Sequence, residues 1–210
     1  MRRAATGVSV KIKICGVTLV EDALLAAELG ADFIGLNFHP PSPRYVGLER
    51  ALAIRNAVAG RARVVGVFVN AAREFIAERA AALRLDLIQF HGDEDEAALA
   101  GWGIPTIRAI RLKPEDNGAP FPATRADYLL LDRFHPELYG GTGRSLALER
   151  LRGRDLSRVF ISGGLGPGNV AEAVALKPYA VDVASGVESS PGVKHDATLR
   201  SFFRNAKSSR

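Results

Sequence analysis

Short apolar runs, many of them rich in β-branched residues, alternate along the chain with stretches in which apolar residues recur every three or four positions. The short runs predict strands, and the longer spacing predicts helices. Several runs are apolar at nearly every position, which is typical of strands buried on both faces of a parallel sheet. Eight strands are expected, at residues 10–15, 32–38, 63–69, 86–90, 104–110, 128–132, 158–162 and 179–184.

The helical spacing falls between these strands and after the last one. Eight β/α units without a linker-like break predict one α/β domain over residues 1–210, a single closed (β/α)8 TIM barrel. Residues 1–9 are expected to form a flexible extension, and a doubly wound open sheet is the alternative fold. Residues 113–124 carry three prolines and one glycine, which disfavours a full helix there. Helices are expected at residues 19–29, 47–59, 72–83, 94–100, 146–151, 169–176 and 194–206.

The composition is that of an ordinary globular protein, with 47% hydrophobic and 24% charged residues. A formal net charge of +5 mildly favours anionic ligands. The arginines are scattered and no basic run is interleaved with aromatic residues, so no nucleic-acid partner is expected. The charge by itself is better explained by a solvated basic surface than by any partner.

A single cysteine excludes an internal disulfide framework and is typical of a reducing compartment. No apolar run approaches the ~18 residues of a membrane span. Residues 1–8 carry two arginines but lack the apolar stretch of a signal peptide. We therefore expect a cytoplasmic protein that has no membrane partner.

In a (β/α)8 barrel, the loops after the carboxyl ends of the strands build the active site. Polar residues at those ends are therefore the first candidates for function. The sequence places there Cys15, Asn37, His39, Arg44, Asn70, His91, Asp132, Ser162 and Asp182.

Cys15 is the candidate base. A lone cysteine is more often a small buried hydrophobic residue, but Cys15 shares one face of its strand with Lys13. A nearby ammonium would lower the pKa of the thiol and make a thiolate accessible. Asp182 lies inside an apolar strand and needs a partner, for which Lys13 is the candidate if the last strand pairs with the first. Contact with substrate hydroxyls is a further role for Asp182.

Asp132 directly follows three leucines, and the loss of hydration there favours a protonated carboxyl that can act as a general acid. The alternative is a helix cap or a loop-bracing role. Arg44 lies in a loop stiffened by three prolines, which suits a guanidinium that holds a carboxylate, although a loose surface arginine is equally compatible. His91 is either a substrate ligand or a loop histidine. The other three histidines have no regular spacing with carboxylates, so no metal site is expected.

Two glycine-containing breaks near the end of the chain indicate phosphate binding. One strand ends at Gly163 and Gly164, and the next ends at Ser185 and Gly186. Bare backbone N–H groups can approach an anion at such breaks, so one phosphate is expected between the two loops. The segments GGTGRS (140–145) and GLGPGN (164–169) match a P-loop and a dinucleotide fingerprint only in part. Both are interpreted as loops that bind or cover phosphate.

Nine segments together resemble phosphoribosylanthranilate isomerase, the barrel enzyme of tryptophan biosynthesis, in order over nearly the whole chain. None is specific alone, but KICG, SPRYV, HGDE and SGVE with PGVK are highly specific in that succession. The segments are KICGVT (13–18), SPRYV (42–46), VGVFVN (65–70), IQFHGDE (88–94), LLLD (129–132), YGGTGRS (139–145), SGGLGPGNV (162–170), VDVASGVE (181–188) and PGVKHD (191–196).

The resemblance implies a barrel of the ribulose-phosphate-binding type and the Amadori rearrangement of N-(5-phosphoribosyl)anthranilate. It implies that Cys15 is the general base, that Asp132 is the general acid and that Arg44 holds the anthranilate carboxylate. The glycine loops would hold the phosphate. No redox change occurs in this reaction, so no nicotinamide or flavin cofactor is expected. The expected partner is a phosphorylated small molecule, and the chain is expected to be a monomer or a homodimer.

The chain departs from the family pattern at Leu-Ala-Leu (146–148), at Ala184, where serine is common, and at Pro41, where lysine is often found. Two rival hypotheses remain at this point. Another phosphosugar barrel enzyme, such as a lyase, would share only the phosphate-binding loops and would not need Arg44. A non-catalytic barrel that binds phosphate or a protein would keep its function after Cys15→Ala and Asp132→Asn.

Overall fold

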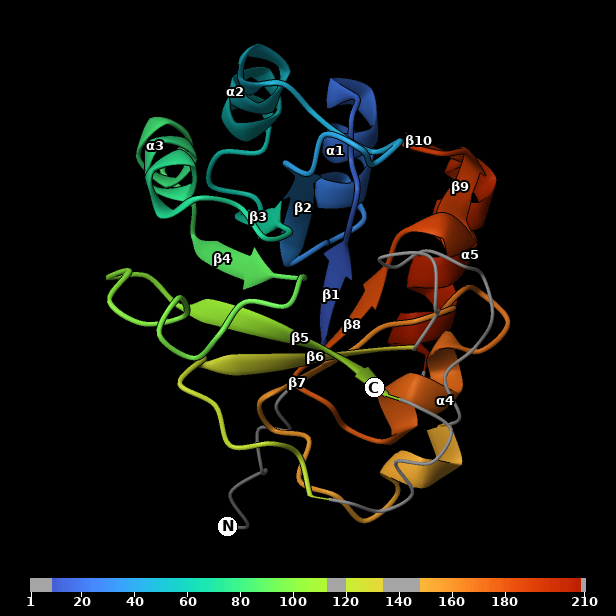
Figure 1. The fold of residues 1–210 in the computed structure, drawn as a ribbon. Coiled ribbons are helices and arrows are strands. Elements are labelled where there is room, and N and C mark those ends of the chain that lie inside the picture. Colours follow the sequence, from blue (N-terminus) through green and yellow to red (C-terminus); the bar gives the residue numbers. More distant parts are fainter. Residues whose placement is uncertain (1–8, 113–119, 134–147, 209–210) are drawn as a thin grey trace, which may run out of the picture.

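The computed structural model describes residues 9–112, 120–133 and 148–208 (Figure 1). Eight parallel strands follow one another around a closed barrel in chain order, and β8 pairs with β1 to complete it. The predicted barrel is therefore confirmed, and the open-sheet alternative is wrong because an open sheet lacks this closing pair. The strands are β1 (Lys11–Ile14), β2 (Phe33–Asn37), β3 (Arg63–Phe68), β4 (Leu87–Phe90), β5 (Thr106–Leu112), β6 (Tyr128–Arg133), β7 (Val159–Ile161) and β8 (Ala180–Val183).

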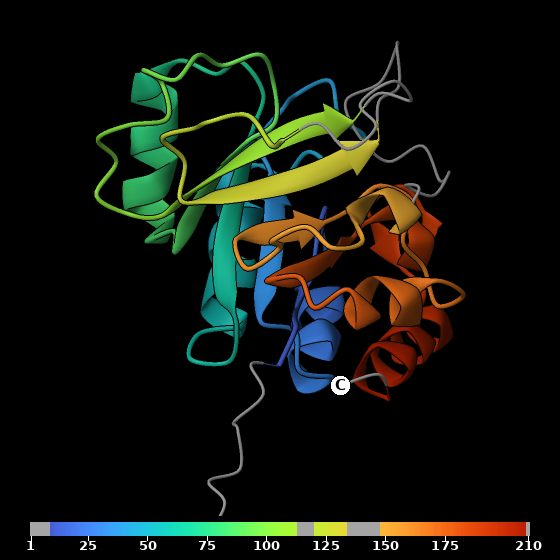
Figure 2. The ribbon, with the colours of Figure 1, turned by 90° about the horizontal axis from the view of Figure 1, so that it is seen from below.

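Helices cover the barrel unevenly. In Figure 1, the helices that follow the first three strands lie together on one side, and those that follow the last two lie on another. Seen from below in Figure 2, β5 and β6 form a long pair flanked mainly by loops in the described part of the chain. The helices are α1 (Val20–Glu28), α2 (Leu48–Ala57), α3 (Arg73–Leu83), α4 (Val170–Ala175) and α5 (Asp196–Lys207), with 3-10 turns η1 (Leu148–Leu151) and η2 (Ser185–Val187).

The predicted helix at 94–100 is wrong, because this segment forms turns. Asp95 Oδ1 accepts the backbone N–H of Ala98 at 2.8 Å, as a helix N-cap does, but only one turn follows it. Gly101 and Gly103 follow with φ of 74° and 70°, which no helix accommodates. The predicted helix at 146–151 is represented by η1, and its first two residues lie outside the described chain. Residues 120–124 have no regular structure, in line with their prolines.

Aromatic and aliphatic side chains fill the amino end of the barrel. Phe33 and Phe160 are fully buried, with ring centroids 5.4 Å apart, and the rings of Tyr128 and Tyr179 lie 4.4 Å apart beside them. Each buried aromatic side chain contributes roughly 1.5–3 kcal/mol of hydrophobic stabilisation. Because side chains fill this end, a pocket with polar side chains can open only at the other end of the barrel, where the strands have their carboxyl ends.

A small antiparallel hairpin that the periodicity does not indicate follows η2. It consists of β9 (Glu188–Ser190) and β10 (Val193–Lys194), joined through Gly192 at φ 86°. The hairpin lies next to the start of α5. It brings two charged side chains, Glu188 and Lys194, back toward the barrel mouth.

Two further expectations from the sequence concern an extension at the start of the chain and a membrane-spanning segment. The expected extension at 1–9 falls almost entirely on residues 1–8, which lie outside the described chain. Among the described helices, none has both the length and the apolar character needed to cross a membrane.

Candidate active site

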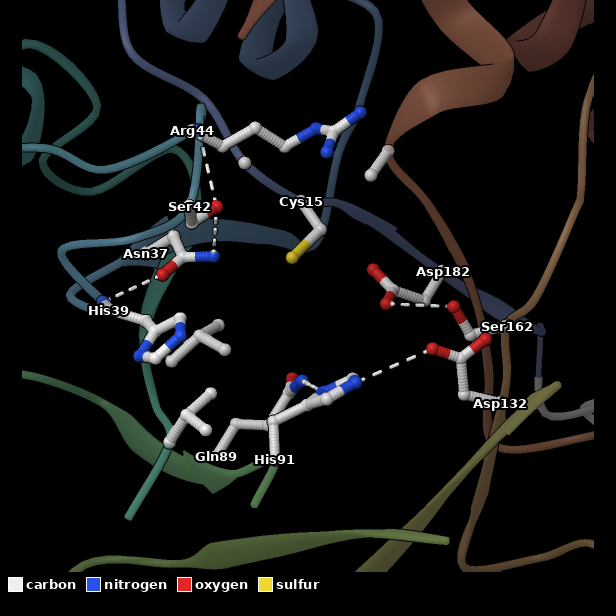
Figure 3. Close-up of a pocket in the computed structure, with 14 residues that line it drawn as sticks. Cys15, Asn37, His39, Ser42, Arg44, Gln89, His91, Asp132, Ser162 and Asp182 are labelled. Carbon is white, nitrogen blue, oxygen red and sulfur yellow. Dashed lines mark hydrogen bonds and ion pairs between the residues drawn. The ribbon is translucent and has the colours of Figure 1, made fainter. Parts of the chain in front are cut away.

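A pocket opens at the carboxyl ends of the strands, and side chains from the ends of every strand except β5, or from the loops that follow them, line it (Figure 3). Eight of the nine polar residues expected at strand ends lie in this pocket. Asn70 lies outside it, where its side chain accepts the backbone N–H of Asp93 at 2.8 Å and braces the third loop against the fourth. The polar lining comprises Cys15, Asn37, His39, Ser42, Arg44, Gln89, His91, Asp132, Ser162 and Asp182.

Closure of the barrel creates a buried ion pair beside the thiol. Lys13 and Asp182 are register partners on β1 and β8, and Lys13 Nζ donates to Asp182 Oδ1 at 2.9 Å. The predicted pairing is confirmed. Ser162 Oγ donates to the other carboxylate oxygen at 3.3 Å, so both oxygens of Asp182 have partners.

Cys15 is partly exposed to the pocket, and burial raises the pKa of its thiol. The positive charge of Lys13 opposes this effect, while the negative charge of Asp182 adds to it. The expectation that Lys13 lowers the thiol pKa overall is therefore wrong, because desolvation outweighs the cation. Burial also acts against the charged form of Lys13, but Asp182 and Cys15 outweigh it and raise the pKa of the ammonium.

Gly35 on β2 makes room for this group. A Cβ at Gly35 would lie 2.9 Å from Cys15 Sγ and 3.3 Å from Lys13 Nζ. Real Cβ atoms essentially never approach another heavy atom as closely as 2.9 Å. The glycine therefore lets the thiol and the ammonium share one side of the barrel interior.

Asp132 reaches the pocket from β6, on the far side from Cys15 (Figure 3). Its side chain is buried, and Oδ2 lies 3.4 Å from His91 Nε2. The Gln89 amide lies 2.8 Å from His91 Nδ1. An amide nitrogen can only donate, so in this arrangement Nδ1 accepts.

Arg44 extends over the Cys15 end of the pocket (Figure 3). Its loop is braced from within, because Ser42 Oγ accepts the Arg44 backbone N–H at 3.2 Å and the Asn37 side-chain amide at 3.1 Å. The guanidinium forms a two-pronged ion pair with Glu188, which raises the pKa of Arg44. Arg44 is thus a held side chain, and the alternative of a loose surface arginine is wrong.

The two glycine loops meet near the ends of β7 and β8. Gly164 and Gly186 line one hollow, while Gly163 and Ser185 precede them in each loop. Gly163 and Gly164 have φ of 81° and 83°, a region that side chains with a Cβ rarely adopt. Asn169 braces the first loop by accepting Gly166 N–H at 2.8 Å and donating to Gly164 O at 3.0 Å. The segment 140–145 lies outside the described chain.

Comparison with known proteins decides the family. Residues 12–205 match the family model of N-(5'phosphoribosyl)anthranilate (PRA) isomerase. The chain belongs to this family. A PRA isomerase from Myxococcus xanthus is 46% identical over 95% of this chain and 97% of its own length. Another from Pseudomonas fluorescens is 44% identical over 93% of this chain and 97% of its own length.

Solved PRA isomerases share the whole architecture. The enzyme from Thermus thermophilus matches with a TM-score of 0.82 and 37% identity, over 95% of this chain and 100% of its own. A PRA isomerase in complex with reduced 1-(o-carboxyphenylamino)-1-deoxyribulose 5-phosphate matches with a TM-score of 0.75 and 34% identity, over 95% and 99% of the two chains. A 3-hexulose-6-phosphate synthase from Salmonella typhimurium, 16% identical with a TM-score of 0.66, shares the fold alone.

Four polar residues of this PRA isomerase pocket or its rim are not among the candidates marked by the sequence: Ser42, Gln89, Glu188 and Lys194. Gln89 is a polar residue within the apolar run LIQF, and this exception to the pattern was the available signal. Its Oε1 is buried and has no hydrogen-bond partner among the described residues. Glu188 and Lys194 lie within the segments SGVE and PGVK, but the contacts of Glu188 with Arg44 and with Lys194 depend on the hairpin.

Among the other histidines, His39 lines the pocket, His195 donates to or accepts from Thr198 at the start of α5, and His135 lies outside the described chain. In the part of the chain that the structure describes, no three His, Cys, Asp or Glu side chains cluster closely enough to hold a metal ion.

Proposed function

We propose that this pocket converts N-(5'-phosphoribosyl)anthranilate into 1-(2-carboxyphenylamino)-1-deoxyribulose 5-phosphate, an Amadori rearrangement in L-tryptophan biosynthesis. The carrying observation is that Cys15 on the β1 side and Asp132 on β6 face one pocket from different sides in a chain of the PRA isomerase family. Hydrogen moves within one molecule, so the activity is that of an aldose–ketose isomerase.

The chemistry needs one acid and one base. Asp132 protonates the ring oxygen of the aminofuranose, the bond between this oxygen and C1 breaks, and an iminium forms between C1 and the anthranilate nitrogen. The iminium makes the hydrogen on C2 acidic, and the thiolate of Cys15 removes it. The resulting enolamine tautomerises to the ketone. These steps transfer protons only, and the proposal calls for no cofactor.

The remaining residues bind the substrate. Arg44 holds the anthranilate carboxylate, since a guanidinium matches a carboxylate with paired hydrogen bonds. His91 and Asp182, at opposite sides of the pocket, contact the sugar hydroxyls. The phosphate lies at the two glycine loops, against Gly163 and Gly164 with Ser185 and Gly186. This arrangement stretches the substrate across the barrel mouth between Cys15 and Asp132.

The test uses substrate made in situ from anthranilate and phosphoribosyl pyrophosphate by the preceding transferase, with loss of substrate fluorescence as the readout. Cys15→Ala and Asp132→Asn are each expected to lower kcat by about 10²–10⁴-fold, the usual contribution of a general acid or base. Asp196→Asn, a change to an exposed carboxylate on α5, is the control and is expected to leave kcat unchanged.

Three results would contradict the proposal. No turnover by the wild-type enzyme would overturn the isomerase assignment. Full activity of both Cys15→Ala and Asp132→Asn would overturn the acid and base roles and would favour a non-catalytic barrel. Turnover of a phosphosugar that carries no arylamine, together with unchanged activity of Arg44→Ala on N-(5'-phosphoribosyl)anthranilate, would favour another phosphosugar enzyme.

The setting of the enzyme is also part of the proposal. We place it in the cytoplasm as a monomer or homodimer acting on a phosphorylated small molecule. A matching solved structure describes mutually generated monomers of the dimeric enzyme from Thermotoga maritima, so this relative has been seen in both forms. Light scattering of the purified chain measures its own state.

A further inference from the structure

A cluster of three charged side chains lies at the rim of the pocket. Arg44 comes from the second loop, and Glu188 and Lys194 come from the two strands of the hairpin that follows η2. Arg44 lines the pocket, whereas Glu188 stands behind it and does not. The side chains of Glu188 and Lys194 are 5% and 0% exposed. The cluster is therefore a buried support for one pocket residue.

The contact between Arg44 and Glu188 is side-on. Arg44 Nε donates to Oε1 at 2.9 Å and to Oε2 at 3.2 Å, and Nη2 donates to Oε2 at 2.7 Å. Among the described residues, Arg44 Nη1 has no hydrogen-bond acceptor. Since the guanidinium is planar and carries five N–H donors, the end of the group formed by Nη1 and Nη2 stays available for a second carboxylate.

Lys194 holds Glu188 from the other side. Its Nζ donates to Glu188 Oε1 at 2.8 Å. Burial acts against the charged form of Glu188, but the hydrogen bonds from Arg44 and Lys194 outweigh it and lower the pKa of the carboxyl. Burial lowers the pKa of Lys194 although the carboxylate opposes this effect. Glu188 receives hydrogen bonds from both Arg44 and Lys194, so its position is fixed from both sides.

The same ammonium also reaches the end of β1. Lys194 Nζ donates to the backbone oxygen of Cys15 at 2.6 Å and approaches that of Ala184 at 3.4 Å. The backbone N–H of Lys194 donates to the buried side chain of Asp22 at 2.8 Å. The support of Arg44 is thus anchored to α1, β8 and the segment that carries the candidate base.

Packing restricts Arg44 further. A Cβ at Gly16 would lie 2.5 Å from Arg44 Cδ, so the aliphatic part of the arginine lies directly against this glycine. Gly16 has φ of 66°, which also disfavours a side chain there. The arginine therefore crosses the first loop along one path, and its guanidinium arrives at the carboxylate of Glu188.

We propose that Glu188 is a positioning residue that gives the enzyme its preference for an arylamine carrying a carboxylate. It does so by fixing Arg44 side-on, so that the open end of the guanidinium meets the substrate carboxylate. This inference rests on the proposed function, in which Arg44 binds anthranilate. Glu188 acts through Arg44 and touches neither the sugar nor the reacting carbons.

The experiment compares two substrates prepared from ribose 5-phosphate, N-(5'-phosphoribosyl)anthranilate and N-(5'-phosphoribosyl)aniline, which lacks the carboxylate. The readout is the ratio of the two kcat/KM values. In Glu188→Gln this ratio is expected to fall about tenfold, the size of one charge-assisted hydrogen bond, through a higher KM for the anthranilate substrate. The kcat/KM for the aniline substrate is expected to stay within about twofold of wild type.

Three variants make the test specific. Glu78→Gln, on the surface of α3, makes the same chemical change in an exposed ion pair and is expected to keep the wild-type ratio. In an Arg44→Lys background, Glu188→Gln is expected to change the ratio no further, because each substitution already removes the same side-on contact between residues 44 and 188. Glu188→Asp keeps the charge and shortens the side chain by one methylene, so it gives the same test if the glutamine variant does not fold.

The outcomes separate this inference from the proposed function. Wild-type turnover with equal losses on both substrates in Glu188→Gln would show a general structural role and overturn the inference. A lower KM for the anthranilate substrate would show that Glu188 competes for Arg44 and would also overturn it. No wild-type turnover of the anthranilate substrate would refute the proposed function itself.

Discussion

At the scale of single residues, the environment of Cys15 is defined by opposing effects on its thiol. Burial and the carboxylate of Asp182 raise the pKa of the thiol, and the ammonium of Lys13 lowers it. Because Lys13 is fully buried and paired with Asp182, its charge is partly neutralised before it acts on the sulfur. The neutral thiol is consequently favoured in the free enzyme, and the thiolate becomes more populated as the pH rises.

This environment predicts an alkaline rise in activity. A base with a raised pKa gains its active form above the ordinary cysteine value of about 8.5, so kcat/KM is expected to increase with pH through that region. Lys13→Met removes the cation that lowers the thiol pKa, and the rise is expected to move to higher pH. Two measurements check this prediction: the far-ultraviolet absorbance of the Cys15 thiolate as a function of pH, and the pH profile of kcat/KM. A rise that moves to lower pH would contradict this view.

At the scale of elements, the hairpin β9–β10 ties the last loop of the barrel to the second loop. Glu188 and Lys194 stand opposite one another in its register, and both side chains turn inward to Arg44 and the end of β1. Hairpins this short are marginal by themselves, so these charged contacts are expected to hold it in place.

The charged contacts of Glu188 in this hairpin lead us to expect a pH-dependent difference in the free energy of unfolding between wild type and Glu188→Gln. The folded state lowers the pKa of Glu188, so its stabilisation is present above the unfolded value of about 4.3 and is lost as the pH falls through the lower folded value. Urea unfolding at pH 7 should show a less stable variant. The difference should shrink as the pH falls through the lowered folded value, because Glu188 then becomes as neutral as the glutamine. A difference that stays constant with pH would contradict the expectation.

The glycine loops after β7 and β8 offer a second prediction at this scale. A Cβ at Gly186 would lie 1.9 Å from the backbone oxygen of Leu165, so Gly186→Ala must separate the two loops. We expect a loss of about 1–3 kcal/mol in the free energy of unfolding, as for other overpacked sites. Gly168→Ala is the control, because its Cβ would enter open space, and thermal unfolding compares the two. Equal unfolding temperatures would show that the loops do not need this close approach.

At the scale of the whole molecule, the pair formed by Lys13 and Asp182 joins the first strand to the last. These residues are register partners 169 positions apart in the chain, and both are buried. A buried pair contributes little compared with an apolar replacement, but one charge left alone is costly. The pair therefore favours the closed register over a shifted one.

Asp182→Asn tests this point. The substitution keeps the shape of the side chain and leaves the Lys13 ammonium without a counter-charge, so a loss of about 3–5 kcal/mol in the free energy of unfolding is expected. Denaturant unfolding measures it, and Asp196→Asn in an exposed pair on α5 is expected to change stability little. A loss as small as that of the control would show that Asp182 does not need its charge.

Prediction from sequence succeeded where a local pattern carries the information. The eight strands lie at their expected places because a short, continuous apolar run is typical of a strand that is buried on both faces of a parallel sheet. The helix predicted at 94–100 does not form because a helix of this length is marginal, and the glycines at 101 and 103, with positive φ, follow after one turn. The roles of Cys15, Asp132 and Arg44 stay predictions, although their meeting in one pocket follows from strand ends that the sequence had already marked.

The order of strands and helices, the barrel they form and the polar residues that end its strands can all be read from the sequence, because they depend on spacing along the chain. Which charged groups meet is set by the folded molecule. Burial outweighs Lys13 at the thiol of Cys15, and Glu188 reaches Arg44 across 144 positions through a hairpin that has no periodic signal. The physical reason is that desolvation and ion pairing depend on distances in the folded molecule, which no local pattern contains.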